Sequence, residues 1–158
     1  MTMPAQRPGK SRQDYETPPD LLDAVTYRWG PLEFDLAATA QNAKAPEFFT
    51  PARNALLQKW DCRDGIAWLN PPYQHIGKWA RKCADADTNG GRILMLVPAS
   101  IGSMWFYRHV WKVAHVIALC GRITFVGCSA PYPKDCMICE YGHPDPGFEV
   151  WKWNRSNQ

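Results

Sequence analysis

The residues Asn70-Pro71-Pro72-Tyr73 combine side chains and carbonyl groups that could bind a flat chemical group carrying an NH2. They follow the apolar run IAWL (66–69), which has the character of a strand. Two successive prolines exclude a helix and remove two backbone donors, so they hold a stiff, extended loop. This loop presents the Asn70 side-chain oxygen and the Pro71 carbonyl as acceptors for the two N–H groups of an amine. The Tyr73 ring offers a stacking surface, and stacking of a base on an aromatic ring is worth about 1–3 kcal/mol.

This combination suits methyl transfer to an exocyclic amine such as adenine N6. The lone pair of that nitrogen is delocalised into the ring, which makes it a poor nucleophile. Hydrogen bonds to two neutral acceptors stabilise the positive charge that develops as the nitrogen attacks, and a methyl sulfonium donor held in line supplies the electrophile. The reaction needs neither a metal nor a covalent enzyme intermediate, but a base in duplex DNA must first be flipped out of the stack. Asn and Pro also form ordinary surface turns; the position directly after an apolar strand favours the functional interpretation.

The elements around this loop alternate between helices and strands. Thr17 is a good N-cap and Pro18 suits the first helical position, which predicts a helix that ends before Gly30. A short strand over 32–36 places Asp35 at its carboxyl end, where ligands bind in open α/β sheets. Apolar patterning predicts the other elements: helices over 52–60, 76–86 and 103–113, and strands over 66–69, 92–98, 115–119, 123–127, 135–142 and 147–153. The predicted fold class is α/β, with a mostly parallel sheet and a C-terminal antiparallel hairpin.

Length and composition indicate one folded domain. The chain has 158 residues, a net charge of +3 and 46% hydrophobic residues, which is too apolar for a wholly disordered chain. We expect a flexible basic tail over 1–13 and a single domain over 14–155. The first residues do not resemble a secretory signal, and no apolar run approaches the roughly 20 residues that span a bilayer. These features predict a cytoplasmic protein with no membrane partner; they do not define an oligomeric state.

The cysteines offer one alternative site. Cys136 and Cys139 have a spacing found in zinc sites, and His143 lies four residues further on. Such a cluster would suit a non-catalytic, zinc-stabilised DNA-binding protein. The segment around these residues has strand character, however, and a free cysteine is commonly a small buried hydrophobe. We therefore predict no metal site.

Several segments spread over residues 15–125 form an ordered set: Tyr15-Glu16-Thr17-Pro18, Phe34-Asp35-Leu36-Ala37-Ala38, Asn42-Ala43-Lys44, Trp68-Leu69-Asn70-Pro71-Pro72-Tyr73, Trp105-Phe106 and Gly121-Arg122-Ile123-Thr124-Phe125. Taken in this order, they resemble the phage-type DNA adenine-N6 methyltransferase family. The Asn-Pro-Pro-Tyr segment is shared by several methyltransferase families, whereas the ordered set is more specific. The resemblance implies a compact, Rossmann-like class I methyltransferase sheet with helices on both faces.

The resemblance also implies a cofactor and roles for individual residues. The cofactor would be S-adenosyl-L-methionine and the substrate DNA; a phage-encoded or prophage-encoded member would act in the cytoplasm of a bacterial host cell. Tyr15, Thr17 and Pro18 would lie against the methionine end of the cofactor. Asp35 would engage the amino group of the cofactor, directly or through water, and Ala37 would allow its close approach. The catalytic set would be the Asn70–Tyr73 tetrapeptide described above.

The chain departs from the wider methyltransferase pattern in several places. Ala37-Ala38-Thr39 stands where a glycine-rich turn is usual, and the acid that commonly binds the cofactor ribose has only weak candidates, which are Glu47, Asp61 and Asp64. No separate target-recognition domain is visible, so DNA contacts would come from the tail, from loops, or from the helix face formed by Lys78, Arg81 and Lys82. Arg122 could reach a phosphate or close the fold. The same tetrapeptide also fits methylation of another planar amide, such as a protein glutamine.

Overall fold

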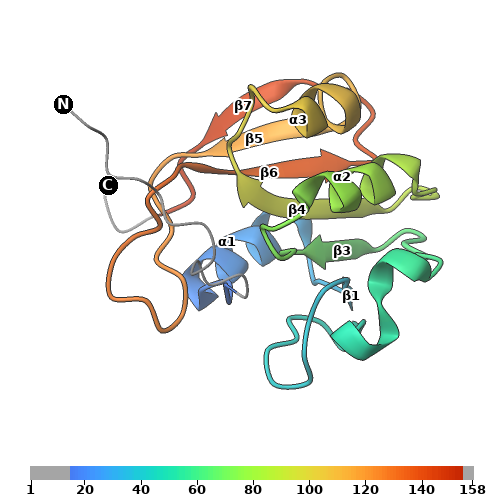
Figure 1. Cartoon of the computed structure of the whole chain (residues 1–158), viewed down its shortest axis with the longest axis horizontal. Helices are drawn as coiled ribbons and strands as arrows, with labels where there is room; N and C mark the ends of the chain where they lie inside the picture. The colour runs from blue at the N-terminus through green and yellow to red at the C-terminus, as the bar shows by residue number, and fades with distance from the viewer. Residues whose placement is uncertain (1–14, 155–158) are drawn as a thin grey trace.

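The computed structural model describes residues 15–154, so the basic tail expected over 1–13 lies outside the described residues. Figure 1 shows a central sheet with helices packed against it. The helices are α1 (Pro19–Trp29), α2 (Ile76–Asp85) and α3 (Met104–His109), with two short 3-10 turns at Pro51–Arg53 and Ala55–Leu57. The strands are β1 (Phe34–Asp35), β2 (Glu47–Phe48), β3 (Ile66–Leu69), β4 (Arg92–Pro98), β5 (His115–Leu119), β6 (Cys136–Tyr141) and β7 (Phe148–Trp151).

The seven strands form one mixed sheet in the order β2-β1-β3-β4-β6-β5-β7. All neighbouring pairs are parallel except the two that involve β6, which runs antiparallel to both β4 and β5. The carboxyl ends of the other strands therefore meet at one edge of the sheet. The predicted α/β fold class is confirmed, but the predicted C-terminal hairpin is wrong, because β5 lies between β6 and β7 and pairs with both.

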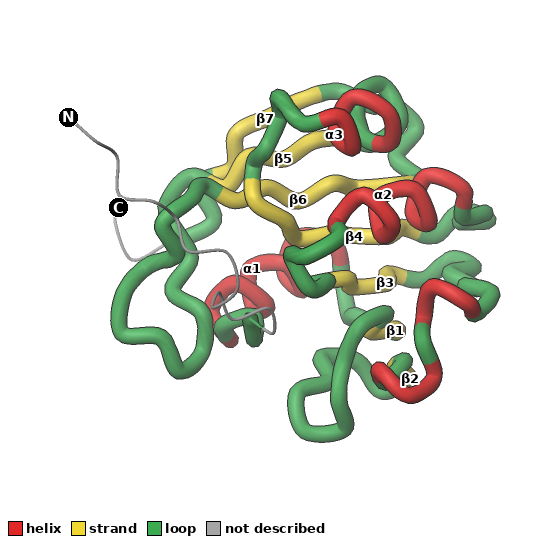
Figure 2. Tube along the Cα trace, viewed as in Figure 1, coloured by secondary structure: helices red, strands yellow, loops and turns green. Residues whose placement is uncertain are grey.

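The two faces of the sheet carry separate cores, and helices cover both faces as expected (Figure 2). In β4, alternate side chains point to opposite faces: Ile93 and Met95 pack on the side of α2 and α3, whereas Leu94 and Leu96 pack on the side of α1. This explains why the sequence of this strand is apolar throughout. No helix within residues 15–154 is long and apolar enough to cross a membrane.

Three predicted elements differ from the structure. The segment 52–60 forms the two short 3-10 turns instead of one helix, and the helix expected over 103–113 ends at His109. The predicted strand over 123–127 is a loop. Its Ile123 and Phe125 are nonetheless buried, at 0% and 2% exposure, because they fill the core on the α1 face from outside the sheet.

Candidate active site

Two neighbouring parallel strands bring Asp35 and Asn70 to the same edge of the sheet. Asp35 ends β1 and pairs in register with Trp68 of β3, and Asn70 follows the last residue of β3. The pairing continues one residue beyond β1, since the Leu36 N–H donates to the Trp68 carbonyl oxygen at 2.9 Å. Ligands of open α/β sheets bind outside the carboxyl ends of the strands, and these residues therefore mark a candidate site.

The Asn70 side chain is held in one orientation by the segment that precedes α1. Its Nδ2 donates to the Tyr15 carbonyl oxygen at 2.6 Å and to Thr17 Oγ1 at 3.0 Å. The other side of the amide, Oδ1, is buried and has no hydrogen-bond partner among the described residues. A flipped amide would place two oxygens against each other at Tyr15. The geometry therefore leaves the Asn70 carbonyl oxygen as a fixed acceptor, and an unpaired buried acceptor is costly unless a ligand donor satisfies it.

Thr17 has a different task from the one predicted at the helix terminus. The helix begins at Pro19, its cap residue is Pro18, and no side chain caps it. The Thr17 hydroxyl oxygen instead accepts a hydrogen bond from Asn70 Nδ2, and Thr17 is only 2% exposed. The helix cap prediction is wrong because a contact across 53 residues of sequence uses the same oxygen. Thr17 and Pro18 are both buried, and Thr17 lines a cavity together with Asn70.

Asp35 closes the loop that follows β1. Its Oδ1 accepts from the Ala37 N–H at 3.2 Å and its Oδ2 from the Lys44 N–H at 3.0 Å. Burial raises the pKa of this carboxyl above its ordinary value, although the two N–H donors and the Lys44 ammonium act in the opposite direction. Lys44 itself forms an ion pair with Glu16 at 2.7 Å. Asp35 thus lies beside the candidate site as a buried acid that organises residues 36–44.

Two cavities adjoin Asn70 and share the residues Tyr15, Ala37, Asn42 and Asn70. The larger has a volume of about 210 Å³, and residues of the loops after β1 and β2 contribute most of its wall. Its other lining residues are Leu36, Ala38, Thr39, Phe49, Thr50, Pro51, Asn54, Ala55, Pro72 and Trp79. The smaller, of about 20 Å³, also contacts Thr17, Asp35, Lys44 and Trp68. All predicted cofactor-binding residues except Pro18 therefore line one or both cavities.

Tyr73 belongs to an aromatic cluster. Its ring centroid lies 5.7 Å from that of Tyr15, 6.3 Å from that of Phe125 and 5.8 Å from that of Tyr132. Its hydroxyl is buried without a hydrogen-bond partner among the described residues, and burial raises its pKa far above the ordinary value. The hydroxyl is consequently neutral at any physiological pH and cannot act as a base. The loop over 120–135 supplies two members of this cluster, Phe125 and Tyr132, and no pattern in the sequence predicts that contact.

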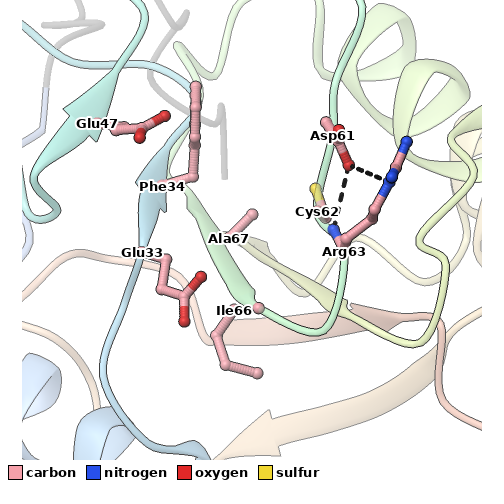
Figure 3. A pocket seen from close by; sticks show the side chains of 9 residues that line it. Glu33, Phe34, Glu47, Asp61, Cys62, Arg63, Ile66 and Ala67 are labelled. Atoms are coloured by element: carbon pink, nitrogen blue, oxygen red, sulfur yellow. Dashed lines mark hydrogen bonds and ion pairs between the residues drawn. The ribbon is translucent and has the colours of Figure 1, made fainter.

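A third cavity, of about 230 Å³, lies at the opposite edge of the sheet, where β1 and β3 begin (Figure 3). Glu47 and Asp61 line it, and Asp61 pairs there with Arg63 at 3.4 Å. These two candidates for a ribose-binding acid therefore lie away from Asn70. The larger cavity beside Asn70 offers Asn54 and Thr50 as polar side chains instead.

The arrangement of the thiols opposes a zinc site. Cys136 packs in the core on the α1 face, whereas Cys139 packs on the α2 and α3 face, because residues three apart in a strand point in opposite directions. His143 stacks on His115 with ring centroids 4.4 Å apart. Within residues 15–154, no group of three or more His, Cys, Asp or Glu side chains is placed to hold a metal ion.

The basic face of α2 is partly occupied by contacts within the protein. Lys82 Nζ donates to the Gln58 carbonyl oxygen at 2.6 Å, and Arg81 pairs with Asp85 at 3.6 Å. Lys78 is exposed. Two of the three predicted cations thus have partners within the protein.

The mixed sheet, with the Asn70 carbonyl held beside two cavities at its carboxyl edge, is consistent with an α/β methyltransferase fold. A family model described as DNA N-6-adenine-methyltransferase (Dam) matches residues 5–136, and the chain belongs to this family. The chain is 27% identical over 117 residues to the "DNA N-6-adenine-methyltransferase" of Escherichia phage T1, a match that covers 74% of the chain and 49% of the phage protein. It is 31% identical over 74 residues to the "Putative methyltransferase YfdM" of Escherichia coli (strain K12), covering 44% of the chain and 81% of that protein.

Sequence reasoning missed several residues of the site. Trp68 lines the smaller cavity, and its buried indole N–H has no acceptor among the described residues. Phe49 and Asn54 line the larger cavity, from a region whose pattern is irregular. The position of Trp68 in the strand that leads into Leu69-Asn70 could have indicated that it belongs to the site. For Phe49 and Asn54, no pattern indicated that their segment lies beside β1.

Proposed function

We propose that this protein transfers a methyl group from S-adenosyl-L-methionine to the N6 amine of adenine in DNA. The observation that carries the proposal is the fixed Asn70 amide, whose Nδ2 is bound by Tyr15 and Thr17 and whose buried Oδ1 has no partner among the described residues. Such an acceptor is satisfied by a donor such as an exocyclic NH2. Family membership supports the choice of adenine in DNA.

The residues beside Asn70 fit the cofactor in chemical character. Asp35 is an acid suited to an amino group, and Ala37 leaves the approach to it open. Tyr15, Thr17 and Pro18 would contact the methionine end, while Phe49 and Asn54 would line the space for the remainder. When bound, S-adenosyl-L-methionine supplies an electrophilic methyl group on a sulfonium.

The tetrapeptide would prepare the amine for attack. The Asn70 Oδ1 and the Pro71 carbonyl accept one N–H each, which stabilises the charge that develops on nitrogen. Pro72 stiffens the loop, and Tyr73 contributes the aromatic surface on which the flipped base is held. Neither carbonyl is a base, and the Tyr73 hydroxyl stays neutral, so the proton released from the amine passes to solvent.

The activity is tested by incubating the protein with labelled S-adenosyl-L-methionine and duplex DNA of varied sequence. After enzymatic digestion of the DNA, we expect label in N6-methyladenine. A parallel incubation with protein extract from a bacterial host tests methylation of a protein glutamine. Label in protein and none in DNA would overturn the proposal, as would binding of both substrates without transfer. We place the reaction in the cytoplasm of a bacterial host.

A further inference from the structure

A fourth cavity lies at the carboxyl edge of the sheet and has the character of an anion site. It has a volume of about 260 Å³ and lies where β5 and β7 end. Its lining residues are Cys120, Gly121, Arg122, Lys152, Trp153 and Asn154. This set contains two cations and no acid.

We propose that this cavity binds a phosphate of the DNA backbone and so positions the duplex on the edge that carries Asn70. The inference rests on the proposed function for its choice of DNA as ligand. The cavity itself is a separate site, formed by other strands than those that hold Asp35 and Asn70.

Trp153 supplies an unpaired donor at this cavity. Its side chain packs in the core on the α1 face and is 6% exposed, yet its buried indole N–H has no acceptor among the described residues. A buried donor without an acceptor is uncommon in folded proteins. Trp153 is one of the residues that line this cavity, and an anionic oxygen bound there is the candidate acceptor for its N–H.

Arg122 supplies a cation that the fold does not use. Its Nε lies 3.7 Å from Asp135 Oδ1, and both side chains are more than half exposed, a type of ion pair that contributes little to stability. The loop after Gly121 is held instead by Ile123 and Phe125, which are buried in the core. The sequence left two roles open for Arg122, which were contact with a phosphate and closure of the fold. Because Arg122 contributes little to closure, we assign it to the phosphate.

The backbone at Gly121 allows close approach of a ligand. Its φ of +100° is a conformation that favours glycine, and a Cβ added there would meet nothing within 4 Å. The Cys120 N–H donates to the Trp151 carbonyl oxygen at 2.9 Å, which ties the ends of β5 and β7 together. The two strand ends beside the cavity are thus held together by the sheet itself.

The position of the cavity suits a duplex that also reaches Asn70. β3, β5 and β7 run parallel, so their carboxyl ends lie on one edge. β5 and β7 are three and four strands away from β3, which corresponds to about 14–19 Å at roughly 4.8 Å per strand. That span equals about four to six base steps at 3.4 Å each. The loop over 120–135 connects both places, because Phe125 contacts Tyr73.

The test measures binding of a fluorescein-labelled duplex of about 20 base pairs and random sequence, by anisotropy, over a series of NaCl concentrations. Each phosphate contact contributes about −0.9 to the slope of log K against log [salt]. Arg122→Ala is expected to reduce the magnitude of that slope by about 0.9 and to weaken binding about eightfold at 0.1 M salt. Arg122→Lys keeps the charge and should keep the slope.

Arg63→Ala is the matched control. Arg63 is also an exposed arginine loosely paired with an aspartate, but it lies in the cavity at the opposite edge of the sheet. Arg63→Ala removes the same charge as Arg122→Ala and should leave the slope of log K against log [salt] unchanged. Equal slopes for Arg122→Ala and the wild type, or equal losses in Arg122→Ala and Arg63→Ala, would overturn the phosphate site.

Trp153→Phe tests the indole donor, with thermal unfolding measured beside it because this residue is in the core. We expect several-fold weaker binding of the duplex with an unchanged salt slope, since a neutral donor is removed. Wild-type affinity in a folded Trp153→Phe protein would contradict its part in the site. The outcome is separable from the proposed function: a slope change in Arg122→Ala without any methyl transfer by the wild type supports the phosphate site and rejects the activity.

Discussion

Replacing Thr17 by valine removes one of the two acceptors that orient the Asn70 amide. Valine has nearly the shape of threonine, and Thr17 is 2% exposed, so the substitution changes a hydrogen bond with little change in packing. The Asn70 Nδ2 keeps its bond to the Tyr15 carbonyl oxygen at 2.6 Å and loses the one to Thr17 Oγ1 at 3.0 Å. The amide is then less firmly held with Oδ1 toward the substrate.

The size of the effect follows from that single bond. A net contribution of about 1 kcal/mol is typical of an intramolecular hydrogen bond, with a larger cost when a buried donor is left unpaired. We therefore expect the free energy of unfolding to fall by about 1–2 kcal/mol. If the same bond sets the amide orientation in the transition state, about 1.4 kcal/mol of lost stabilisation corresponds to a tenfold lower kcat/KM for DNA.

The assay is the initial rate of N6-methyladenine formation at saturating cofactor, with thermal unfolding as a parallel measurement. Thr17→Ser is the matched control, because it keeps the hydroxyl and should retain kcat/KM within about threefold. Wild-type kcat/KM in Thr17→Val would refute the orienting role. A loss in Thr17→Ser equal to that in Thr17→Val would assign the effect to side-chain shape instead.

Three further predictions concern the pH dependence of cofactor binding at Asp35, the contribution of Glu149 to stability in acid, and the lack of space for a side chain at Gly91. Burial raises the pKa of Asp35, so this carboxyl becomes neutral at a higher pH than an ordinary aspartate; cofactor Kd should rise up to tenfold per pH unit below that pKa by linkage, and Asp35→Asn should abolish this dependence in calorimetric titrations. The carboxyl of Glu149 is partly desolvated, which raises its pKa, but the hydrogen bonds and charges of Arg28 and His115 together outweigh this effect and lower the pKa. The resulting stability is present above the unfolded pKa and is lost as pH falls through the folded value. The midpoint of thermal unfolding of Glu149→Gln should therefore depend less on pH in the acidic range than that of the wild type. Gly91→Ala would place a Cβ 1.7 Å from a backbone oxygen and should lower the free energy of unfolding in urea by at least about 2 kcal/mol, whereas Gly102→Ala, with nothing within 4 Å, should be nearly neutral.

The elements that the sequence predicted well are those whose pattern depends on their own burial. The strand over 92–98 and the helix over 76–86 were predicted with at most one residue of error, because a long apolar run and a helical apolar face each report contact with the core. β2 was missed because it consists of two residues, Glu47 and Phe48, whose pairing with β1 is not encoded in any local period. The apolar run over 123–127 has a strand's composition, yet its side chains fill the core from a loop.

Within the candidate site, residue types were predictable and their contacts were not. Asn70 and Asp35 were identified from strand ends, where chemistry is commonly located. The bond between Asn70 and Thr17 spans 53 residues, and no spacing rule relates them. The insertion of β6 between β4 and β5 is similarly a property of the whole sheet, since turn residues after β6 favour a local hairpin that the long-range pairs override.

The central claim is that the Asn70 carbonyl oxygen accepts the substrate amine during methyl transfer. It is tested most directly by the single-turnover rate of N6-methyladenine formation in DNA for Asn70→Ala and the wild type, with both proteins shown to be folded and saturated with cofactor. Removal of one group that stabilises developing charge typically costs about 100- to 1,000-fold in rate, and we predict a loss of that size. A rate within threefold of the wild type would contradict the account.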